Sequence, residues 1–316
     1  MGIAKAPTKL LLQESLRKPL EGRVLQLGRQ TVFVTEQELR GLAAKIGAKL
    51  QDIDEVKLSW DPNYARLKYL SDDSYFRLLG FSQCESLDNF DYEGAMHILD
   101  LNVPEVPDNL RNRFDFIVDG GTIEHVFHVP NVLNNIFSML KVGGRILHIS
   151  PSSNHMDHGF YMFSPTFFLD FYAANKFEIN LAQVARYTRK PDVHPWLAMN
   201  YTPGSLDRIS VGGLDDGIYA IFFLATKTAE STGTAVPQQN LYLRTLSPPA
   251  PVSVSRTGTH RFSQTAKILL KKMPGFHYMD IVRHKLIAIP RFVRYKIDAL
   301  LPSRWKRGVL RIDTKY

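Results

Sequence analysis

Hydrophobic and polar residues follow two kinds of pattern along the chain. Short apolar runs between polar residues predict buried strands, whereas apolar residues spaced three or four apart predict helices with one buried face. The predicted strands are residues 24–28, 85–88, 97–101, 114–119, 145–150, 177–185 and 217–225. The predicted helices are residues 35–49, 71–79, 131–140 and 164–175. Strands that alternate with helices indicate an α/β fold with a mainly parallel sheet and right-handed crossovers.

Local signals support several of these boundaries. Thr35 and Glu38 have the spacing of a capping box, in which each side chain bonds the backbone N–H of the other residue. They therefore predict the start of a helix. Gly80 predicts a helix end, because glycine adopts the left-handed conformation found there. The pair Gly143-Gly144 predicts the end of the helix over residues 131–140 in the same way.

The composition indicates a folded protein of a reducing compartment of the cell. Apolar residues make up 44% of the 316 residues, which is enough for a sizeable core. Cys84 is the single cysteine, so no intramolecular disulfide can form. Residues 1–12 lack the apolar run of a signal peptide, and no stretch reaches the roughly 18 apolar residues of a membrane span. We expect a cytoplasmic protein.

The composition changes after residue 228, which divides the chain into four predicted parts. Residues 1–20 form a short helix or N-terminal arm, and residues 21–228 form the α/β domain. Residues 229–260 are rich in Thr, Ser, Pro and Gln and predict a flexible linker. Residues 261–316 mix basic, aromatic and aliphatic residues, and prolines divide them into short helices.

The net charge of +8 is concentrated at the C-terminal end. Residues 256–316 hold 15 basic and three acidic residues, a net charge of +12, while the other 24 basic and 28 acidic residues give −4. Such asymmetry indicates an anionic partner. For residues 261–316 we expect docking on the chain's own domain or on a partner protein first. An anionic membrane surface, with the protein then peripheral, comes second. Nucleic acid comes last, because no recognised nucleic-acid motif is present.

Residues 114–151 hold the most informative pattern. The buried strand over residues 114–119 ends in polar residues, and ligands of open α/β sheets bind beyond the carboxyl ends of strands. Gly120 and Gly121 follow, where glycine allows a sharp turn and the close approach of a ligand. Glu124 and His125 come next, before the predicted helix. We therefore expect a ligand at this edge of the sheet.

These motifs occur in a familiar order. Phe114-Asp115 begins the strand, Glu124-His125 follows it, and Leu140-Lys141-Val142-Gly143-Gly144 precedes the next strand. In order and spacing this segment resembles class I S-adenosylmethionine-dependent methyltransferases. The resemblance extends over roughly two-thirds of the chain and is most specific in this segment. It implies a Rossmann-like, mainly parallel sheet with helices on both faces, and S-adenosylmethionine as the cofactor.

The resemblance also implies a set of cofactor-binding residues. Asp88, at the end of the second strand, corresponds to the acid that accepts hydrogen bonds from the ribose hydroxyls, and Asp100 corresponds to an adenine contact. The other implied contacts are Gly28, Asp119, Gly120, Gly121 and Glu124.

The loop after the first strand departs from the family pattern. Gln26 stands where an acid is usual, and Arg29-Gln30 replaces the remaining loop glycines. Arg29 either contacts a carboxylate of the cofactor or blocks its pocket.

Histidines near the same edge are candidates for catalysis. His125 can act as a general base for an alcohol or phenol because the pKa of histidine lies near neutrality, or it can pack on the sheet and fix the loop. His158 is the second candidate base, while His155, Asp157 and Tyr161 are candidate acceptor contacts. The same cluster also suits a local hydrogen-bonding loop. We expect no metal, because its spacing matches no strong metal motif.

Three functions remain open from the sequence, and one of them is a membrane- or polymer-associated protein whose basic segment is the functional part. The other two concern the α/β domain. The first is methyl transfer from S-adenosylmethionine to a small-molecule or glycan-type acceptor, mainly by alignment in a dry pocket. The second is a catalytically inactive binding or scaffold protein with the same fold, which Gln26 and Arg29 favour. Its basic segment would then associate with a partner or a membrane surface.

Overall fold

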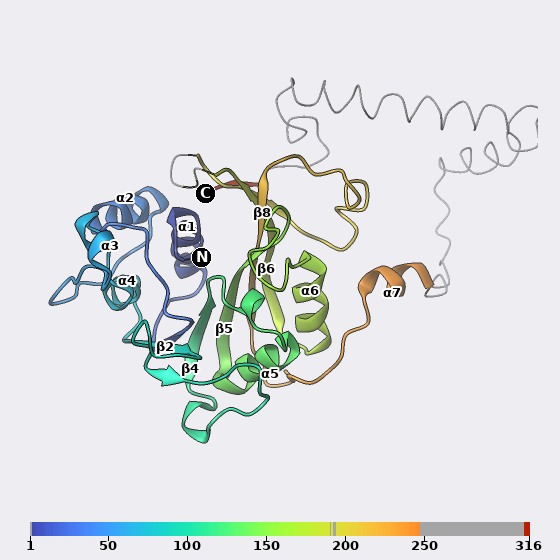
Figure 1. Cartoon of the computed structure of the whole chain (residues 1–316), viewed down its shortest axis with the longest axis horizontal. Helices are drawn as coiled ribbons and strands as arrows, with labels where there is room; N and C mark the ends of the chain where they lie inside the picture. Colours follow the sequence, from blue (N-terminus) through green and yellow to red (C-terminus); the bar gives the residue numbers. More distant parts are fainter. Residues whose placement is uncertain (1, 190, 192–193, 247–312) are drawn as a thin grey trace, which may run out of the picture. The chain divides into compact units, whose positions relative to one another are not determined.

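The computed structural model describes residues 2–189, 191, 194–246 and 313–316 (Figure 1). Residues 247–260 of the predicted linker and residues 261–312 of the basic segment lie outside the described residues. The partner and membrane contacts predicted for that segment therefore concern residues that the structure does not describe. Among the described helices, none is both long and apolar enough to cross a membrane.

The described chain forms one mixed sheet, whose strands follow the spatial order β3-β2-β1-β4-β5-β8-β6-β7-β9. The first five strands along the chain are β1 (Arg23–Leu27), β2 (Gln83–Asp88), β3 (His97–Ile98), β4 (Phe114–Asp119) and β5 (Leu140–Pro151). They pair in parallel with one another. The other four are β6 (Glu178–Tyr187), β7 (Leu197–Asn200), β8 (Ile218–Thr226) and β9 (Thr314–Lys315). These pair antiparallel with their neighbours.

This strand order identifies the fold. The parallel half runs outward in both directions from β1 and β4, which are neighbours, so the direction of winding reverses between them. The last strand of the α/β part, β8, inserts antiparallel between β5 and β6. The fold is that of class I methyltransferases. Its ligands bind where the winding reverses, at the carboxyl ends of the strands.

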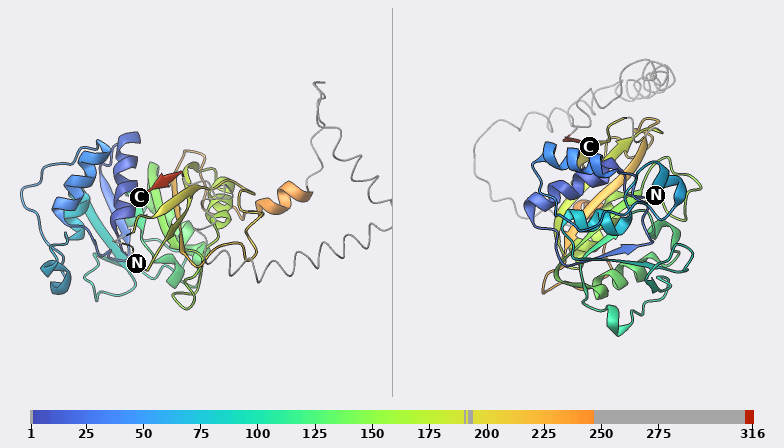
Figure 2. Two further views of the ribbon diagram at one scale, coloured as in Figure 1. Left: turned by 90° about the horizontal axis from the view of Figure 1, so that it is seen from above. Right: turned by 90° about the vertical axis from the view of Figure 1, so that its left-hand side faces the viewer.

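Helices cover both faces of the sheet (Figures 1 and 2). The helices of the described residues are α1 (Lys5–Arg17), α2 (Glu36–Ile46), α3 (Pro62–Arg66), α4 (Asp72–Leu79), α5 (Val129–Met139), α6 (Pro165–Ala174) and α7 (Asn240–Leu246), of which α7 does not cover the sheet (Figure 1). Alternate residues of β4, such as Phe116 and Val118, are buried in one core with residues of α1, α2 and α4. Between them along the strand, Ile117 is also fully buried. Because both faces of this strand are buried, its sequence is a continuous run of mostly apolar residues.

Two of the three predicted helix signals are present in the structure. Thr35 and Glu38 form a capping box at the start of α2. Gly80 is the C-cap of α4. The Gly143-Gly144 segment differs from the prediction, because it lies inside β5 and is not a turn outside the strand. The pairing of β4 with β5 shifts register between Phe114 and Phe116, and Gly143 has a left-handed φ of +82°.

The N-terminal residues pack against the domain. α1 buries Leu10, Leu11 and Leu12, and it lies beside α2. Glu14 of α1 is buried and forms an ion pair with Arg145 of β5, which is buried too. This helix therefore contributes to the core that covers the sheet.

Part of the predicted linker also packs against the domain. Asn175, which is fully buried after α6, accepts hydrogen bonds from the Thr232 hydroxyl at 2.8 Å and from the Ala235 backbone at 2.9 Å. Further along, the Asn240 backbone donates to Asp170 of α6 at 3.0 Å. Buried polar groups on and after α6 thus hold this stretch in place.

Candidate functional site

A cavity of about 390 Å³ opens at the carboxyl ends of the parallel strands. Its walls come from the residues that follow β1, β2, β3 and β4, around the point where the winding of the sheet reverses. Five of the residues predicted from the sequence line it: Gly28, Asp88, Asp100, Gly121 and His125. Segments far apart in the sequence are therefore brought together as the strand pattern predicted.

Gly28 forms the floor of this cavity. Its φ of +66° is left-handed, and its backbone N–H donates to the carbonyl oxygen of Leu87 at 2.7 Å. A Cβ atom at this position would lie 2.8 Å from Thr122 Oγ1 and 3.7 Å from Asp88 Oδ2. Glycine is required here both by conformation and by space.

Asp88 directs one carboxylate oxygen toward the floor. Its Oδ1 atom accepts a hydrogen bond from the Asn89 backbone at 2.7 Å, which fixes the side chain at the end of β2. Its Oδ2 atom is the one that lies near Gly28. Asp100 is held in a similar way, because its Oδ1 atom accepts from the backbone and side-chain amides of Asn102 at 2.9 and 2.8 Å. Both acids are pre-oriented on the cavity wall.

An acid from α4 lies beside Gln26 of β1. Gln26 Nε2 donates to Asp72 Oδ2 at 3.0 Å, and Asp72 is the first residue of α4. Arg29 Nε donates to the same oxygen at 3.1 Å, while Arg29 Nη1 donates to the Glu93 carbonyl at 2.7 Å. The Arg29 guanidinium lines the cavity but is held by Asp72 and the Glu93 backbone, so it does not close the cavity.

Gln30 fills the space beside Gly120. It is buried, and its Nε2 atom donates to the carbonyl oxygens of Leu27 at 2.7 Å and Gly28 at 3.2 Å. A Cβ atom at Gly120 would collide with the Gln30 Oε1 atom. That Oε1 atom has no hydrogen-bond donor within the described part of the chain. It is therefore a buried, unpaired acceptor beside the cavity.

Asp119 lies below the cavity and does not line it. Its Oδ2 atom is 2.7 Å from His148 Nδ1, and its Oδ1 atom accepts from the Thr122 backbone at 3.0 Å. His148 Nε2 lies 2.7 Å from the Tyr172 hydroxyl of α6. Burial, followed by the charge of Asp119, raises the pKa of Tyr172. Asp119 thus belongs to a buried chain of polar groups that holds the loop, and its predicted contact with the cofactor stays a prediction.

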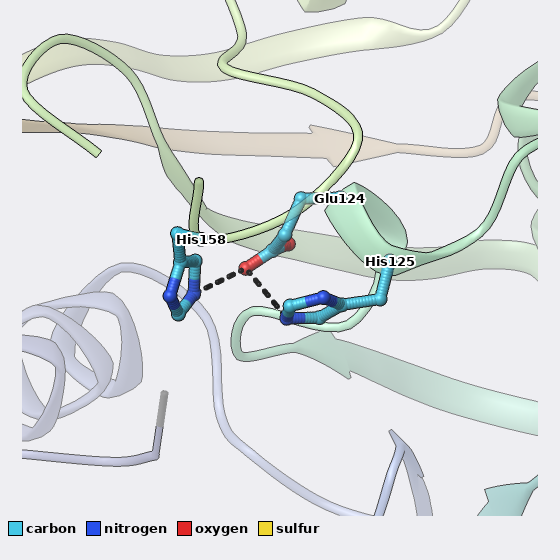
Figure 3. A group of neighbouring side chains, drawn as sticks. All are labelled: Glu124, His125 and His158. Carbon is cyan, nitrogen blue, oxygen red and sulfur yellow. Dashed lines mark ion pairs between the residues drawn. The ribbon is translucent and has the colours of Figure 1, made fainter. Parts of the chain in front are cut away.

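Glu124 lies between the two candidate bases (Figure 3). It belongs to the short 3-10 turn Ile123–His125, and its side chain has no exposed surface. Its Oε1 atom lies 3.9 Å from His125 Nε2 and 3.6 Å from His158 Nε2. Burial, and next the charge of Asp119, raises the pKa of Glu124 to about 8. Burial lowers the pKa of both histidines, which favours neutral imidazoles.

The loop after β5 carries His158 to this position. A Cβ atom at Gly159 would lie 2.9 Å from the Glu124 carbonyl oxygen, and the Tyr161 backbone donates to that oxygen at 3.3 Å. His155 Nε2 lies 2.9 Å from the Tyr187 hydroxyl, and its ring centroid is 5.5 Å from that of His158. The loop is therefore packed directly on Glu124.

The predicted acceptor contacts lie beside the cavity and do not line it. His155 is engaged with Tyr187 of β6, and the Tyr161 hydroxyl donates to the Phe127 carbonyl at 2.7 Å. Asp157 is exposed and has a left-handed φ of +66°, so it turns the loop. Sequence reasoning missed Asp72, His148 and Tyr172, because each belongs to an element whose contact with the site depends on tertiary packing.

No protein-family model and no curated protein matches the chain. Solved structures of methyltransferases do match it at low identity. The 1,6-didemethyltoxoflavin-N1-methyltransferase of Burkholderia thailandensis is 14% identical with a TM-score of 0.35, over 70% of this chain and 77% of that chain. An O-methyltransferase of a Brevibacillus brevis multienzyme is 14% identical with a TM-score of 0.36, over 72% and 73%. Phosphoethanolamine N-methyltransferase 2 of Haemonchus contortus is 13% identical with a TM-score of 0.37, over 70% and 52%.

Proposed function

We propose that this chain transfers a methyl group from S-adenosylmethionine to a small-molecule or glycan-type acceptor. The observation that carries the proposal is the cavity where the winding of the sheet reverses. Gly28 forms its floor, and the carboxylates of Asp88 and Asp100 stand on its wall. These groups lie where an open α/β sheet binds a nucleotide-like ligand.

The residues present suit the adenosine half of the cofactor. The Oδ2 atom of Asp88 faces the Gly28 floor, and one carboxylate can accept hydrogen bonds from both ribose hydroxyls. Leu99, Leu101 and Phe90 line the same cavity and offer apolar surface to an adenine ring, with Asp100 beside them as an acceptor. This half combines apolar walls with a few fixed polar groups, as ligand sites usually do.

The methionine half has an unusual donor set that is still compatible with the cofactor. Gln30 Oε1 is a buried acceptor without a donor among the described residues, which an ammonium group would supply, and Arg29 is a cation suited to a carboxylate. Asp72 fixes the Arg29 guanidinium, which reduces the ordering required when a ligand binds. When bound, the cofactor supplies a methyl group activated by a sulfonium.

The acceptor would approach from the side of Glu124, His125 and His158. His125 lines the cavity and lies beside the buried carboxylate, so this cluster borders the space where the methyl group would be presented. Alignment of the acceptor with the methyl group would supply most of the rate enhancement. The two histidines would border a hydroxyl acceptor held in this space.

The test is isothermal titration of the full chain with S-adenosylmethionine and S-adenosylhomocysteine. We expect one site per chain. Asp88→Ala should weaken binding by about tenfold or more, since losing a charged hydrogen-bond partner costs about 1.5–3 kcal/mol. Asp91→Ala is the matched control, because Asp91 is an exposed acid in the following turn and does not line the cavity. Absence of binding at millimolar ligand would contradict the proposal.

Gln30 favours one alternative function, a binding protein that keeps the fold without turnover. Its side chain crowds Gly120, on the side of the cavity where family members have glycine. This alternative expects no binding of either ligand by the wild-type chain and recovered binding by Gln30→Gly. The methyltransferase proposal expects wild-type binding, which Gln30→Gly would weaken by removing an acceptor.

A further inference from the structure

Three potential metal ligands converge at the edge of the cavity. Glu124 and His125 come from the turn after β4, and His158 comes from the loop after β5 (Figure 3). Each offers one ligand atom, and these atoms all lie within 4.8 Å of one another. The two imidazoles lie on either side of the carboxylate and direct ring nitrogens toward it. This geometry brings donors from two segments to a single point.

The burial of Glu124 needs a physical explanation. Both of its carboxylate oxygens are buried, and neither has a hydrogen-bond partner among the residues that the structure describes. An unsatisfied buried polar group costs about 1–3 kcal/mol, and a buried charge costs more. Folded proteins normally hold buried carboxylates by pairing them or by coordinating metal ions. The Glu124 carboxylate therefore lacks the donor or cation that normally accompanies a buried acid.

The distances are close to those of a coordinated ion. Ligand atoms around a tetrahedral ion with bonds of about 2.0–2.1 Å are separated by about 3.3 Å. The observed separations from Glu124 Oε1 are 3.6 Å to His158 Nε2 and 3.9 Å to His125 Nε2. Both histidine side chains are partly exposed, at 36% and 47%, so small side-chain rotations can close the site. The Glu124 carboxylate, fixed by burial, would be the anchor.

We propose that Glu124, His125 and His158 bind a divalent first-row transition-metal ion. Two imidazoles and one carboxylate are a ligand set for ions such as Zn²⁺, Fe²⁺ or Mn²⁺, and they leave coordination positions open for substrate. The histidines then act as ligands, and this replaces the proton-acceptor role predicted for them from the sequence. The proposal also replaces the expectation of no metal, which considered only the spacing in the 155–158 segment.

The role of the ion rests on the proposed methyl transfer, although its binding does not. An ion held here would bind the oxygen of a hydroxyl acceptor and lower the pKa of that hydroxyl. The hydroxyl proton would pass to solvent water. The new bond would form between that oxygen and the methyl carbon, while the bond from the methyl carbon to sulfur breaks with its electron pair left on sulfur. The proposal thus names the acceptor class as a hydroxyl compound.

Direct titration tests binding of the ion. The full chain, freed of any affinity tag and of metal by chelator and dialysis, would be titrated with ZnCl₂ and separately with MnCl₂. We expect one site per chain with at least one of these ions, and about tenfold or weaker binding in Glu124→Gln and in His158→Ala. His194→Ala is the matched control, because His194 pairs with Thr188 outside the cluster. The Co²⁺-loaded protein should show a visible absorption band that both cluster variants lose.

The same variants separate the two proposals. Glu124→Gln and His158→Ala should keep their circular dichroism spectra, and Asp88→Ala should bind the ion as the wild type does. Equal ion affinity in wild type, Glu124→Gln and His158→Ala would overturn the metal site, as would no binding of either ion by the wild type. Failure of the wild type to bind S-adenosylmethionine would overturn the proposed function alone. The metal site would then still stand or fall by the ion titration alone.

Discussion

Gly28 is the residue whose substitution most directly tests the cavity floor. Its φ of +66° costs an L-residue about 1–2 kcal/mol, and a Cβ atom would lie 2.8 Å from Thr122 Oγ1. Gly28→Ala should therefore lower both the free energy of unfolding and the affinity for S-adenosylhomocysteine, the latter by about tenfold or more. Urea unfolding and isothermal titration measure the two effects.

Gly47 offers a control that separates backbone strain from crowding. It has a φ of +80°, at the C-cap of α2, and an added Cβ atom would meet nothing within 4 Å. Gly47→Ala should lose a similar free energy of unfolding through strain while it keeps the ligand affinity of the wild type. An equal loss of affinity in both variants would show that general destabilisation, and not the floor, is responsible.

Residues at strand ends were the ones whose position beside the cavity the sequence could predict. Gly28, Asp88 and Asp100 follow strands of a parallel sheet, and the carboxyl ends of such strands meet at one edge. Asp119 follows a strand too, but its side chain points to His148 in the neighbouring strand β5. Side-chain direction at a strand end depends on buried partners, which a local pattern does not contain. The unpaired state of Glu124 escaped prediction for the same reason.

At the scale of elements, the start of α4 contributes to the edge of the site. Asp72 is 6% exposed, and it binds Gln26 of β1 and Arg29 of the following loop. Asp72→Ala would leave the Arg29 charge without its partner. The free energy of unfolding should fall by about 2–3 kcal/mol, less than for a fully buried pair because Arg29 is still 24% exposed. Chemical denaturation followed by circular dichroism measures this loss.

Asp73, the next residue of α4, is the matched control. It is 50% exposed, and its nearest cation, Arg77, lies 3.9 Å away on the same helix. Asp73→Ala should change the free energy of unfolding by about 0.5 kcal/mol or less. Comparable losses in the two variants would mean that α4 only needs an acid in its first turn. The link between Asp72 and β1 would then contribute nothing specific.

Elements were easier to predict than the contacts between them. The capping box of α2 and the apolar run of β4 are local, so periodicity and caps located them. The bond from Gln26 to Asp72 joins residues 46 apart in sequence, and the substitution of an amide for the usual acid gave no sign of it. β7 and β9 also went unpredicted, because they are short and their pairing depends on distant segments.

At the scale of the whole molecule, the parallel and the antiparallel halves of the sheet contribute differently. The parallel strands carry the cavity, and the antiparallel strands complete the sheet beside them. The last residues of the sequence return to this second side. β9 pairs with β7, and the backbones of Tyr316 and Trp196 bond each other at 2.8 and 3.1 Å. The final residue of the predicted basic segment is therefore part of the domain core.

Tyr316 should consequently contribute to the stability of the whole domain. It is 4% exposed, its hydroxyl donates to Gln183 Oε1 at 2.8 Å, and its ring packs edge-on against Phe222 at 5.5 Å. Tyr316→Ala should lower the free energy of unfolding by about 2–4 kcal/mol, since it removes buried aromatic surface and leaves Gln183 without its donor. Lys315→Ala, at the exposed neighbouring position, should leave stability within about 0.5 kcal/mol of the wild type. If urea denaturation gave the same midpoint for both variants, β9 would be a peripheral addition. The strands before the basic segment would then account for the stability of the domain without β9.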